Sequence, residues 1–127
     1  MPIFIVTVPK SPLSSTQKIQ LSEEITRVHC DITGAPSYFT QVIFNEISDG
    51  NYFVGGKPLQ GTDHIWVHGI IRAGREAEIK ERLLVELMKV LSKIAQVDEQ
   101  NVQVYRIRCG YKSQCSQPQI CKFTSLI

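Results

Sequence analysis

Pro2 carries the most unusual chemical group that this sequence offers. Removal of Met1 would leave proline as the first residue, and its nitrogen would then be a secondary amine. Burial and nearby cations both lower the pKa of an amine from its ordinary value of about 8. An amine that titrates near neutral pH can act as a general base, a general acid or a nucleophile. A Met-Pro start taken alone, however, is most often only a start.

Arg72 and Arg75 lie three residues apart, where an expected strand gives way to an expected helix. Arginine binds carboxylates through two parallel hydrogen bonds, so the pair indicates a small anionic substrate, a carboxylate. The two cations would also depress the pKa of a proline amine nearby. The alternative is a solvated helix start. A cation at a helix N-terminus opposes the helix dipole, which mildly favours a functional reason for Arg75.

His29 and Tyr105 are further candidates, each with an ordinary structural alternative. His29 falls near the end of an expected helix, where a partly buried histidine is stabilised by the helix dipole. Tyr105 falls in an expected strand and reads equally well as a core aromatic residue. His64 and His68 have no acidic or cysteine partner at metal-ligand spacing, so we interpret them as structural.

The first half of the chain predicts a strand, a helix and a strand. An apolar, β-branched run from Pro2 to Val8 is typical of a buried strand. Ser14 and Gln17 have the spacing of a capping box, and Gly34 is a natural helix stop. Residues 38–47 are rich in aromatic and β-branched types and predict the second strand. The apolar stripe of the intervening helix is Leu21, Ile25, Val28 and Ile32.

The second half repeats this plan after a loop marked by Asp49-Gly50 and Gly55-Gly56. We expect a strand over residues 64–71, a helix over 76–95 and a strand over 102–107. The apolar stripe of that helix is Ile79, Leu83, Leu87, Val90 and Ile94. Each helix would connect two parallel strands. The fold class is therefore α+β, with two β-α-β units that place two helices on one face of a four-stranded sheet. The other face of the sheet is partly apolar, which favours an oligomer in which another chain covers it.

Composition limits the classes of partner and compartment. The 127 residues carry a formal net charge of +2 and are 43% hydrophobic, which predicts one domain without nucleic-acid binding. We expect no membrane span and no signal peptide, and hence a cytoplasmic protein. The cysteines form no Cys-x-x-Cys pair, so free thiols are expected and no metal or other cofactor. They are Cys30, Cys109, Cys115 and Cys121.

Taken together, these segments resemble the cis-3-chloroacrylic acid dehalogenase branch of the tautomerase superfamily. That superfamily includes 4-oxalocrotonate tautomerase and macrophage migration inhibitory factor. The resemblance covers about residues 2–107 and rests on the joint order of short motifs. They are the MPIF start, ITRVHCDITG around His29, QVIFNE, NYFVGG, HIWVHG, the Arg72-x-x-Arg75 pair and VYRI around Tyr105.

The resemblance implies a fold, an assembly and a role for each site residue. Two fused β-α-β units, residues 2–47 and 63–107, would form a tautomerase-like domain over 1–108, and three chains would form a homotrimer. Pro2 would be the catalytic base or acid, while Arg72 and Arg75 bind and polarise the substrate carboxylate. His29 would help to bind the carboxylate, and Tyr105 would orient or activate water.

The tail, residues 109–127, departs from that pattern. The dehalogenases carry a glutamate shortly after the fourth strand, yet residues 108–127 contain no aspartate or glutamate. Our leading hypothesis is therefore a tautomerase, or isomerase, that transfers protons on a small α-keto or unsaturated carboxylate. The alternatives are a cis-3-haloacrylate dehalogenase or hydratase, and a catalytically impaired trimeric binding protein.

Overall fold

The computed structural model describes residues 2–9, 13–61 and 64–109, without the side chains of 105–109. Its helices are α1 (Ser15–Thr33) and α2 (Ala77–Ala95), with short 3-10 turns η1 (Ser37–Phe39) and η2 (Glu99–Asn101). Its strands are β1 (Ile3–Pro9), β2 (Gln41–Ile47), β3 (Phe53–Val54), β4 (Lys57–Pro58), β5 (Ile65–Arg72) and β6 (Val102–Cys109). The strand expected over 102–107 extends to Cys109, so the first residue of the expected tail, 109–127, belongs to β6; the rest of that tail lies outside the described residues.

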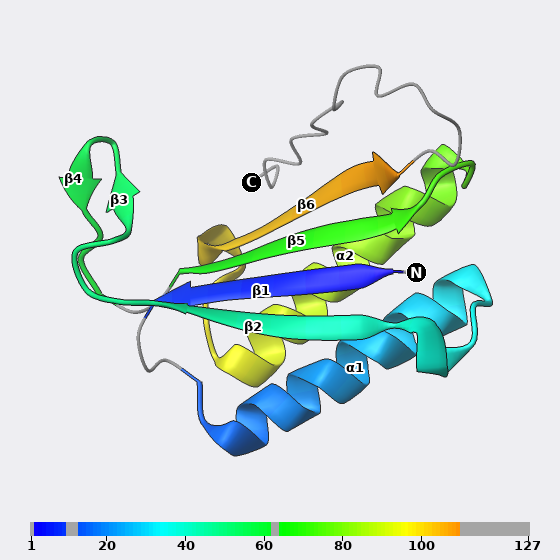
Figure 1. Cartoon of the computed structure of the whole chain (residues 1–127), viewed down its shortest axis with the longest axis horizontal. Coiled ribbons are helices and arrows are strands. Elements are labelled where there is room, and N and C mark those ends of the chain that lie inside the picture. The colour runs from blue at the N-terminus through cyan, green and yellow to red at the C-terminus, as the bar shows by residue number, and fades with distance from the viewer. Residues whose placement is uncertain (1, 10–12, 62–63, 110–127) are drawn as a thin grey trace.

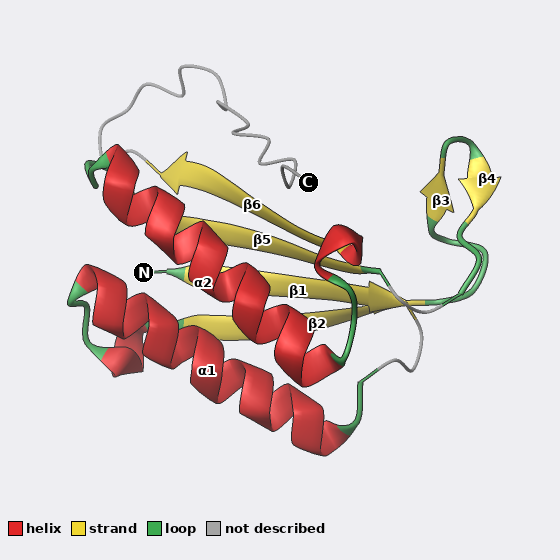
Figure 2. Ribbon diagram, turned by 180° about the vertical axis from the view of Figure 1, so that it is seen from behind, coloured by secondary structure: helices red, strands yellow, loops and turns green. Residues whose placement is uncertain are grey.

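The four long strands form one sheet in the order β2-β1-β5-β6. β1 pairs with β2 in parallel, β5 pairs with β6 in parallel, and the two units join through the antiparallel pair β1–β5. Both helices lie on the same face of this sheet (Figures 1 and 2). The expected α+β architecture of two β-α-β units is thus confirmed.

Strand alternation separates the core from the opposite sheet face. Phe4, Val6 and Val8 of β1 are buried beneath the helices, as are Ile65 and Val67 of β5. The first helix presents the stripe that its spacing predicts, because Leu21, Ile25 and Val28 are buried and Ile32 packs against them. Burial of such side chains contributes roughly 1.5–3 kcal/mol each.

The second helix buries a wider face than its predicted stripe. Leu83 and Leu87 are buried as expected, but Val90 and Ile94 are only half-buried. Leu84 and Leu91, which the predicted stripe omits, are buried instead. The reason is that α2 packs against α1 as well as against β6, so two adjoining faces of this helix are covered.

Capping fixes where the two helices begin and end. Ser14 and Gln17 form the predicted capping box at the start of α1. Gly34 ends α1 in the left-handed conformation at φ 72°, and its N–H donates to the Cys30 carbonyl oxygen at 2.8 Å. Gln96 ends α2 in the same conformation at φ 55°, which a side chain disfavours. The two 19-residue helices therefore end alike, with a glycine in one and a glutamine in the other.

Two segments differ from the sequence prediction. The strand expected from residue 38 begins only at Gln41, because Phe39 and Thr40 donate N–H bonds to the carbonyls of Pro36 and Ser37 and close the turn η1. The expected loop contains the small hairpin β3–β4, whose two turn residues are the glycines at 55 and 56, both with positive φ. Gly-Gly between two short strands is a favoured hairpin turn.

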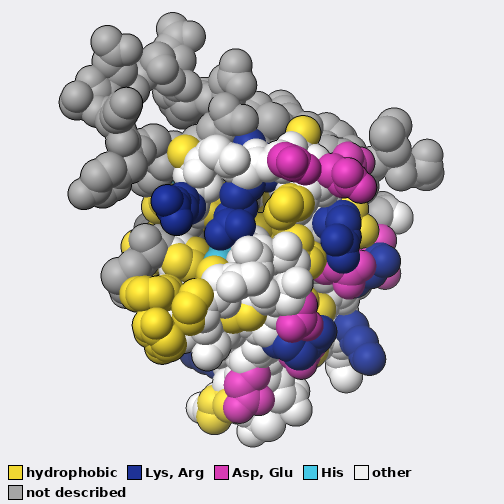
Figure 3. Space-filling model, turned by 90° about the vertical axis from the view of Figure 1, so that its right-hand side faces the viewer, with side chains coloured by type: hydrophobic (Ala, Val, Ile, Leu, Met, Phe, Trp, Pro, Cys, Tyr) yellow, Lys and Arg dark blue, Asp and Glu magenta, His cyan; other side chains and the backbone are white. Residues whose placement is uncertain are grey.

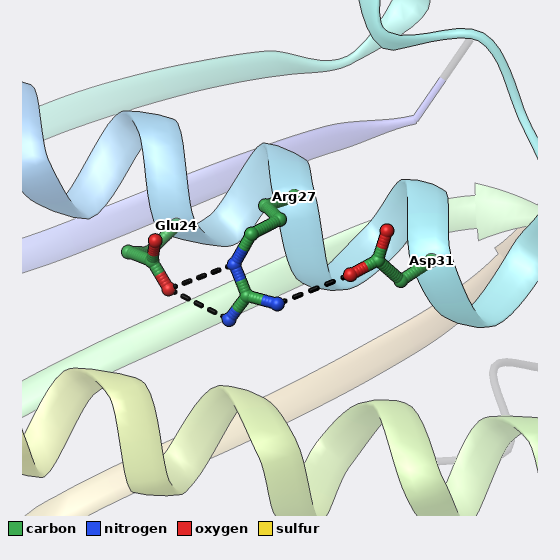
Figure 4. A network of polar contacts seen from close by, with 3 residues as sticks. All are labelled: Glu24, Arg27 and Asp31. Carbon is green, nitrogen blue, oxygen red and sulfur yellow. Dashed lines mark hydrogen bonds and ion pairs between the residues drawn. The ribbon is translucent and has the colours of Figure 1, made fainter.

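The outer surface of α1 carries a small network of ion pairs. Arg27 binds Glu24 at 2.7 Å and Asp31 at 3.1 Å, one turn to either side (Figure 4). All three side chains are exposed enough for solvent to screen them, so the network supports the helix only weakly. It lies on a helix surface that contributes nothing to the pocket described below.

The sheet face opposite the helices is partly apolar. Strand alternation places Ile3 and Ile5 of β1 there, beside Ile43 of β2, which is 48% exposed. The Thr7 hydroxyl and the His68 Nε2 are buried and have no hydrogen-bond partner among the described residues. No helix in the described part of the chain combines the length and apolar character needed to cross a bilayer.

Candidate active site

One end of the molecule brings together the start of β1, the end of α1 and the end of β5 (Figure 1). Pro2 is buried at this end, immediately before β1. Its carbonyl oxygen accepts the N–H of Gln41 at 3.0 Å, so the first pair of the parallel β1–β2 ladder fixes the proline backbone. Parallel pairing is what carries Pro2 to the C-terminal end of α1, since the helix must run back along the sheet.

α1 contributes His29, whose side chain is only 1% exposed. The edge of its ring packs against Phe4, with centroids 5.6 Å apart and planes at 69°. Phe4 itself pairs with Gly69 of β5, which has no side chain to compete for that space. On the other side, the His29 Nδ1 lies 3.4 Å from the Thr40 hydroxyl. The ring is therefore oriented by its neighbours on both sides.

Burial, and to a smaller extent the positive charge of Arg75, together lower the pKa of His29 to about 4. The histidine is therefore neutral at physiological pH. It can offer a hydrogen bond to an anion, but it adds no positive charge. The ordinary alternative, a partly buried histidine charged by the helix dipole, does not describe this residue.

Arg72 and Arg75 stand on either side of a turn that Gly74 makes possible with φ 90°. Arg72 is the exposed last residue of β5, whereas Arg75 is half-buried. The Arg75 Nη1 donates to the Thr33 carbonyl oxygen at 3.1 Å, in the last turn of α1. Its Nε is buried and has no hydrogen-bond partner within the described residues. That unused N–H is a donor for which an anionic ligand would supply the acceptor.

The helix dipole that acts on Arg75 is that of α1 and not, as its position in the sequence predicts, that of α2. Arg75 precedes α2, where a cation is unfavourable, but its guanidinium reaches the C-terminal end of α1. A helix C-terminus has partial negative charge and stabilises a cation. The observed position of the Arg75 guanidinium is therefore electrostatically favourable, and the helix dipole gives no separate argument for a functional role of Arg75.

These residues line one pocket of about 480 Å³. Figure 3 views this end, where cationic and apolar side chains border the same hollow. Four of the sequence-derived site residues, Pro2, His29, Arg72 and Arg75, lie on its wall. The remaining lining residues, which sequence reasoning did not single out, are Thr33, Gly34, Ala35, Pro36 and Phe39.

Only the backbone of Tyr105 is described, so its role at the site stays a prediction. Its backbone pairs with His68 in the β5–β6 ladder, and its side chain lies outside the described residues. His68, expected to be structural, packs beside Trp66 at 5.6 Å between ring centroids. Among the cysteines only Cys30 has a described side chain; it is half-buried and free.

Thr33 and Phe39 had only faint sequence signals. Thr33 precedes the helix-stopping glycine, and its hydroxyl donates to the His29 carbonyl oxygen at 2.6 Å. Phe39 falls within the strand predicted for residues 38–47, and that prediction did not place its side chain near the site. The turn η1 instead places it on the pocket wall.

Known proteins share both the sequence pattern and the fold. A family model described as "Putative oxalocrotonate tautomerase enzyme" matches residues 1–108. No curated protein matches the chain. The structure of native Ps01740 is 28% identical with a TM-score of 0.80, covering 86% of this chain and 95% of that one.

Two further structures show the same fold at lower identity. N1, a member of the cis-3-chloroacrylic acid dehalogenase family, is 24% identical with a TM-score of 0.82, covering 97% of this chain and 85% of its own. The F6 fused 4-OT wild type asymmetric trimer is 20% identical with a TM-score of 0.79, covering 91% of this chain and 94% of its own.

Proposed function

The chain belongs to the oxalocrotonate tautomerase family of the tautomerase superfamily, and we propose on this basis that it is an amino-terminal-proline isomerase. It transfers a proton on a small α-keto or unsaturated carboxylate, with Pro2 as the base. The observation that carries the proposal is the pocket itself. A buried Pro2 shares it with two arginines, one of which has a buried N–H without a partner among the described residues.

The pocket is suited to binding a carboxylate. Arg72 and Arg75 supply its positive charge, and guanidinium groups bind a carboxylate through paired hydrogen bonds. His29, being neutral, adds a hydrogen bond rather than a charge. Burial and the two cations both disfavour a protonated amine at Pro2, which keeps that nitrogen available as a base.

The reaction is an isomerisation and needs no co-reactant. The Pro2 nitrogen takes the proton of the substrate's enol hydroxyl, and the O–H bonding electrons complete the carbonyl group. The former C=C electron pair then takes a proton from the prolinium ion at carbon, which restores the free amine. Arg72 and Arg75 stabilise the negative charge that passes through the enolate, a preorganised effect of roughly 3–4 kcal/mol per donor. The proposal includes no metal or organic cofactor.

Assembly as a homotrimer is part of the proposal. The F6 fused 4-OT neighbour is a trimer, and this chain has an uncovered apolar sheet face. A partner chain on that face would cover Ile43 and could reach the buried polar atoms of Thr7 and His68. The domain would comprise residues 1–108, and residues 109–127 would form a separate tail.

Dehalogenation or hydration of a cis-3-haloacrylate is the second candidate. Its support is the similarity to N1 over 97% of the chain. Tyr105 would orient the attacking water in this reaction. The absence of an acidic residue from 108–127 counts against it, because hydration needs a base for the water.

In the first experiment the protein is incubated with 3-bromopropiolate, and its intact mass is measured before and after. This reagent labels a protein where a carboxylate-binding site and a nucleophilic amine occur together. We expect loss of Met1 and a single adduct at Pro2, together with ketonisation of a short dienol acid that Pro2→Ala abolishes. Retention of Met1 would make the proline nitrogen an amide and contradict the proposal. Unchanged ketonisation in Pro2→Ala would contradict it equally, and a stable trimer without turnover would indicate a binding protein.

A further inference from the structure

We propose that this pocket selects a monocarboxylic acid with a ring-sized apolar tail, and that Phe39 determines this selectivity. The inference rests on the proposed function for the identity of the site and specifies the substrate class that the site accepts. Three properties of the pocket carry it: the distribution of its charges, the composition of its wall and its volume.

The charges come from a single segment. Of the described residues lining the pocket, only Arg72 and Arg75 carry charged side chains; Arg72 ends β5 and Arg75 follows it in the β5–α2 connection. A single carboxylate has two oxygens that can accept hydrogen bonds from guanidinium groups. Among the described residues, a second carboxylate on the same ligand would meet only uncharged lining side chains and lose hydration without gaining a partner, which is costly. The pocket therefore favours a monoacid over a diacid.

Another part of the pocket lining is apolar and includes an exposed aromatic ring. Ala35, Pro36 and Phe39 line the pocket from the connection between α1 and β2. Phe39 keeps 41% of its surface exposed, and Tyr38 beside it keeps 77%. Their rings lie 4.4 Å apart at an angle of 47°. Tyr38 thus supports the Phe39 ring from outside the pocket, and an apolar ligand tail would cover exposed ring surface.

The volume exceeds the needs of a three-carbon acid. At about 480 Å³ the pocket falls within the range of about 300–1,000 Å³ that is typical of sites for larger ligands. A three-carbon acid, with about six non-hydrogen atoms, would leave much of that space to water. An added ring would occupy it and contact Phe39, while the carboxylate stays on the arginines.

Binding of inert acids tests this selectivity without requiring any turnover. Propanoate, 3-phenylpropanoate and adipate are titrated against the full-length protein and followed by calorimetry. We expect 3-phenylpropanoate to bind at least about ten-fold more tightly than propanoate, and adipate to gain no such advantage. Phe39→Ala should reduce the phenyl preference to about three-fold or less, and Phe39→Leu should retain part of it. Phe53→Ala, an exposed aromatic residue of β3, is the matched control and should leave the preference unchanged.

Several outcomes would overturn the inference. One is equal affinity for propanoate and 3-phenylpropanoate, and failure of both acids to bind counts as the same result. The others are tighter binding of adipate and a phenyl preference that survives in Phe39→Ala. The result is separable from the proposed reaction. A phenyl preference that depends on Phe39, found without any Pro2-dependent turnover, would support this inference and overturn the isomerase assignment alone.

Discussion

The guanidinium of Arg75 donates a hydrogen bond to the carbonyl oxygen of Thr33 at 3.1 Å, joining the β5–α2 connection to the last turn of α1. This bond links the two β-α-β units at the wall of the pocket. It occupies one nitrogen of the guanidinium and leaves the buried Nε available. Arg75 is thus held by the protein on one side and able to bind a ligand on the other.

Replacing Arg75 should reduce turnover without unfolding the protein. We expect Arg75→Ala to lower kcat/KM for a dienol carboxylate by about 100-fold, since a preorganised charged donor is lost. Arg75→Lys should recover only part of this, because an ammonium group cannot make the paired bonds. Steady-state kinetics would measure both. Arg27→Ala, which removes an exposed arginine from the α1 network, is the control and should behave like the native protein; equal losses in the two variants would contradict the assignment.

His29 should titrate far below the usual range for histidine. Its pKa of about 4 in the folded state lies below the ordinary histidine value of 6.5, so the unfolded chain binds more protons between these two values. Stability is therefore fully present above about pH 6.5 and falls as the pH drops toward 4, by on the order of 3 kcal/mol. NMR titration of the His29 ring and denaturation at several pH values would measure the two effects. His29→Gln should remove this part of the pH dependence; an inflection near pH 6.5 in the native ring would refute the prediction.

The two helix ends offer a reciprocal test of backbone strain. Gln96→Gly should stabilise the protein by about 0.5–1 kcal/mol, because glycine adopts the left-handed conformation without penalty. Gly34→Ala should destabilise it by about 1 kcal/mol, since φ is 72° and the space around the new Cβ is open, so no clash contributes. Equilibrium unfolding in urea gives both values. Changes of the same sign in the two variants would show that something other than the cap conformation dominates.

The uncovered sheet face should control assembly. We expect Ile43→Asp to convert the trimer to monomers, since a carboxylate on this face would be buried without a partner. Ile19→Asp, on the exposed surface of α1, is the control and should remain trimeric. Sedimentation velocity distinguishes these states. A native protein that sediments as a monomer, or an unaffected Ile43→Asp variant, would exclude this face as the interface.

Sequence periodicity was sufficient for the fold because the strands and α1 bury regular faces, and α2 departs from its predicted stripe only by burying a wider face. The α1 stripe from Leu21 to Val28 and the capping box at Ser14 are local patterns, and the structure confirms both. The order of β-α-β units followed from these elements and from the handedness of parallel crossovers. The hairpin β3–β4 was missed although its glycine pair signalled it, since each strand has only two residues.

Contacts between segments that are far apart in the sequence could not be predicted from local patterns. Residues 38 and 39 have strong strand preference, but the bonds to the Pro36 and Ser37 carbonyls form a turn instead. The partner of Arg75 lies 42 residues earlier in the chain, and local dipole reasoning considered only the adjacent helix. The burial that makes His29 neutral likewise depends on Phe4 and Thr40, which approach only in the folded sheet.

The two helices of equal length also differ in what they hold at matching positions. His29 and Leu91 each lie fourteen residues after the first residue of their helix, and both are fully buried. An imidazole in one unit is thus matched by a hydrocarbon side chain in the other. The histidine position therefore occurs once in each chain, although the fold that presents it occurs twice. The second unit contributes Arg72 and Arg75 to the same pocket instead, so the two halves share one pocket and substitutions in either half can reach it.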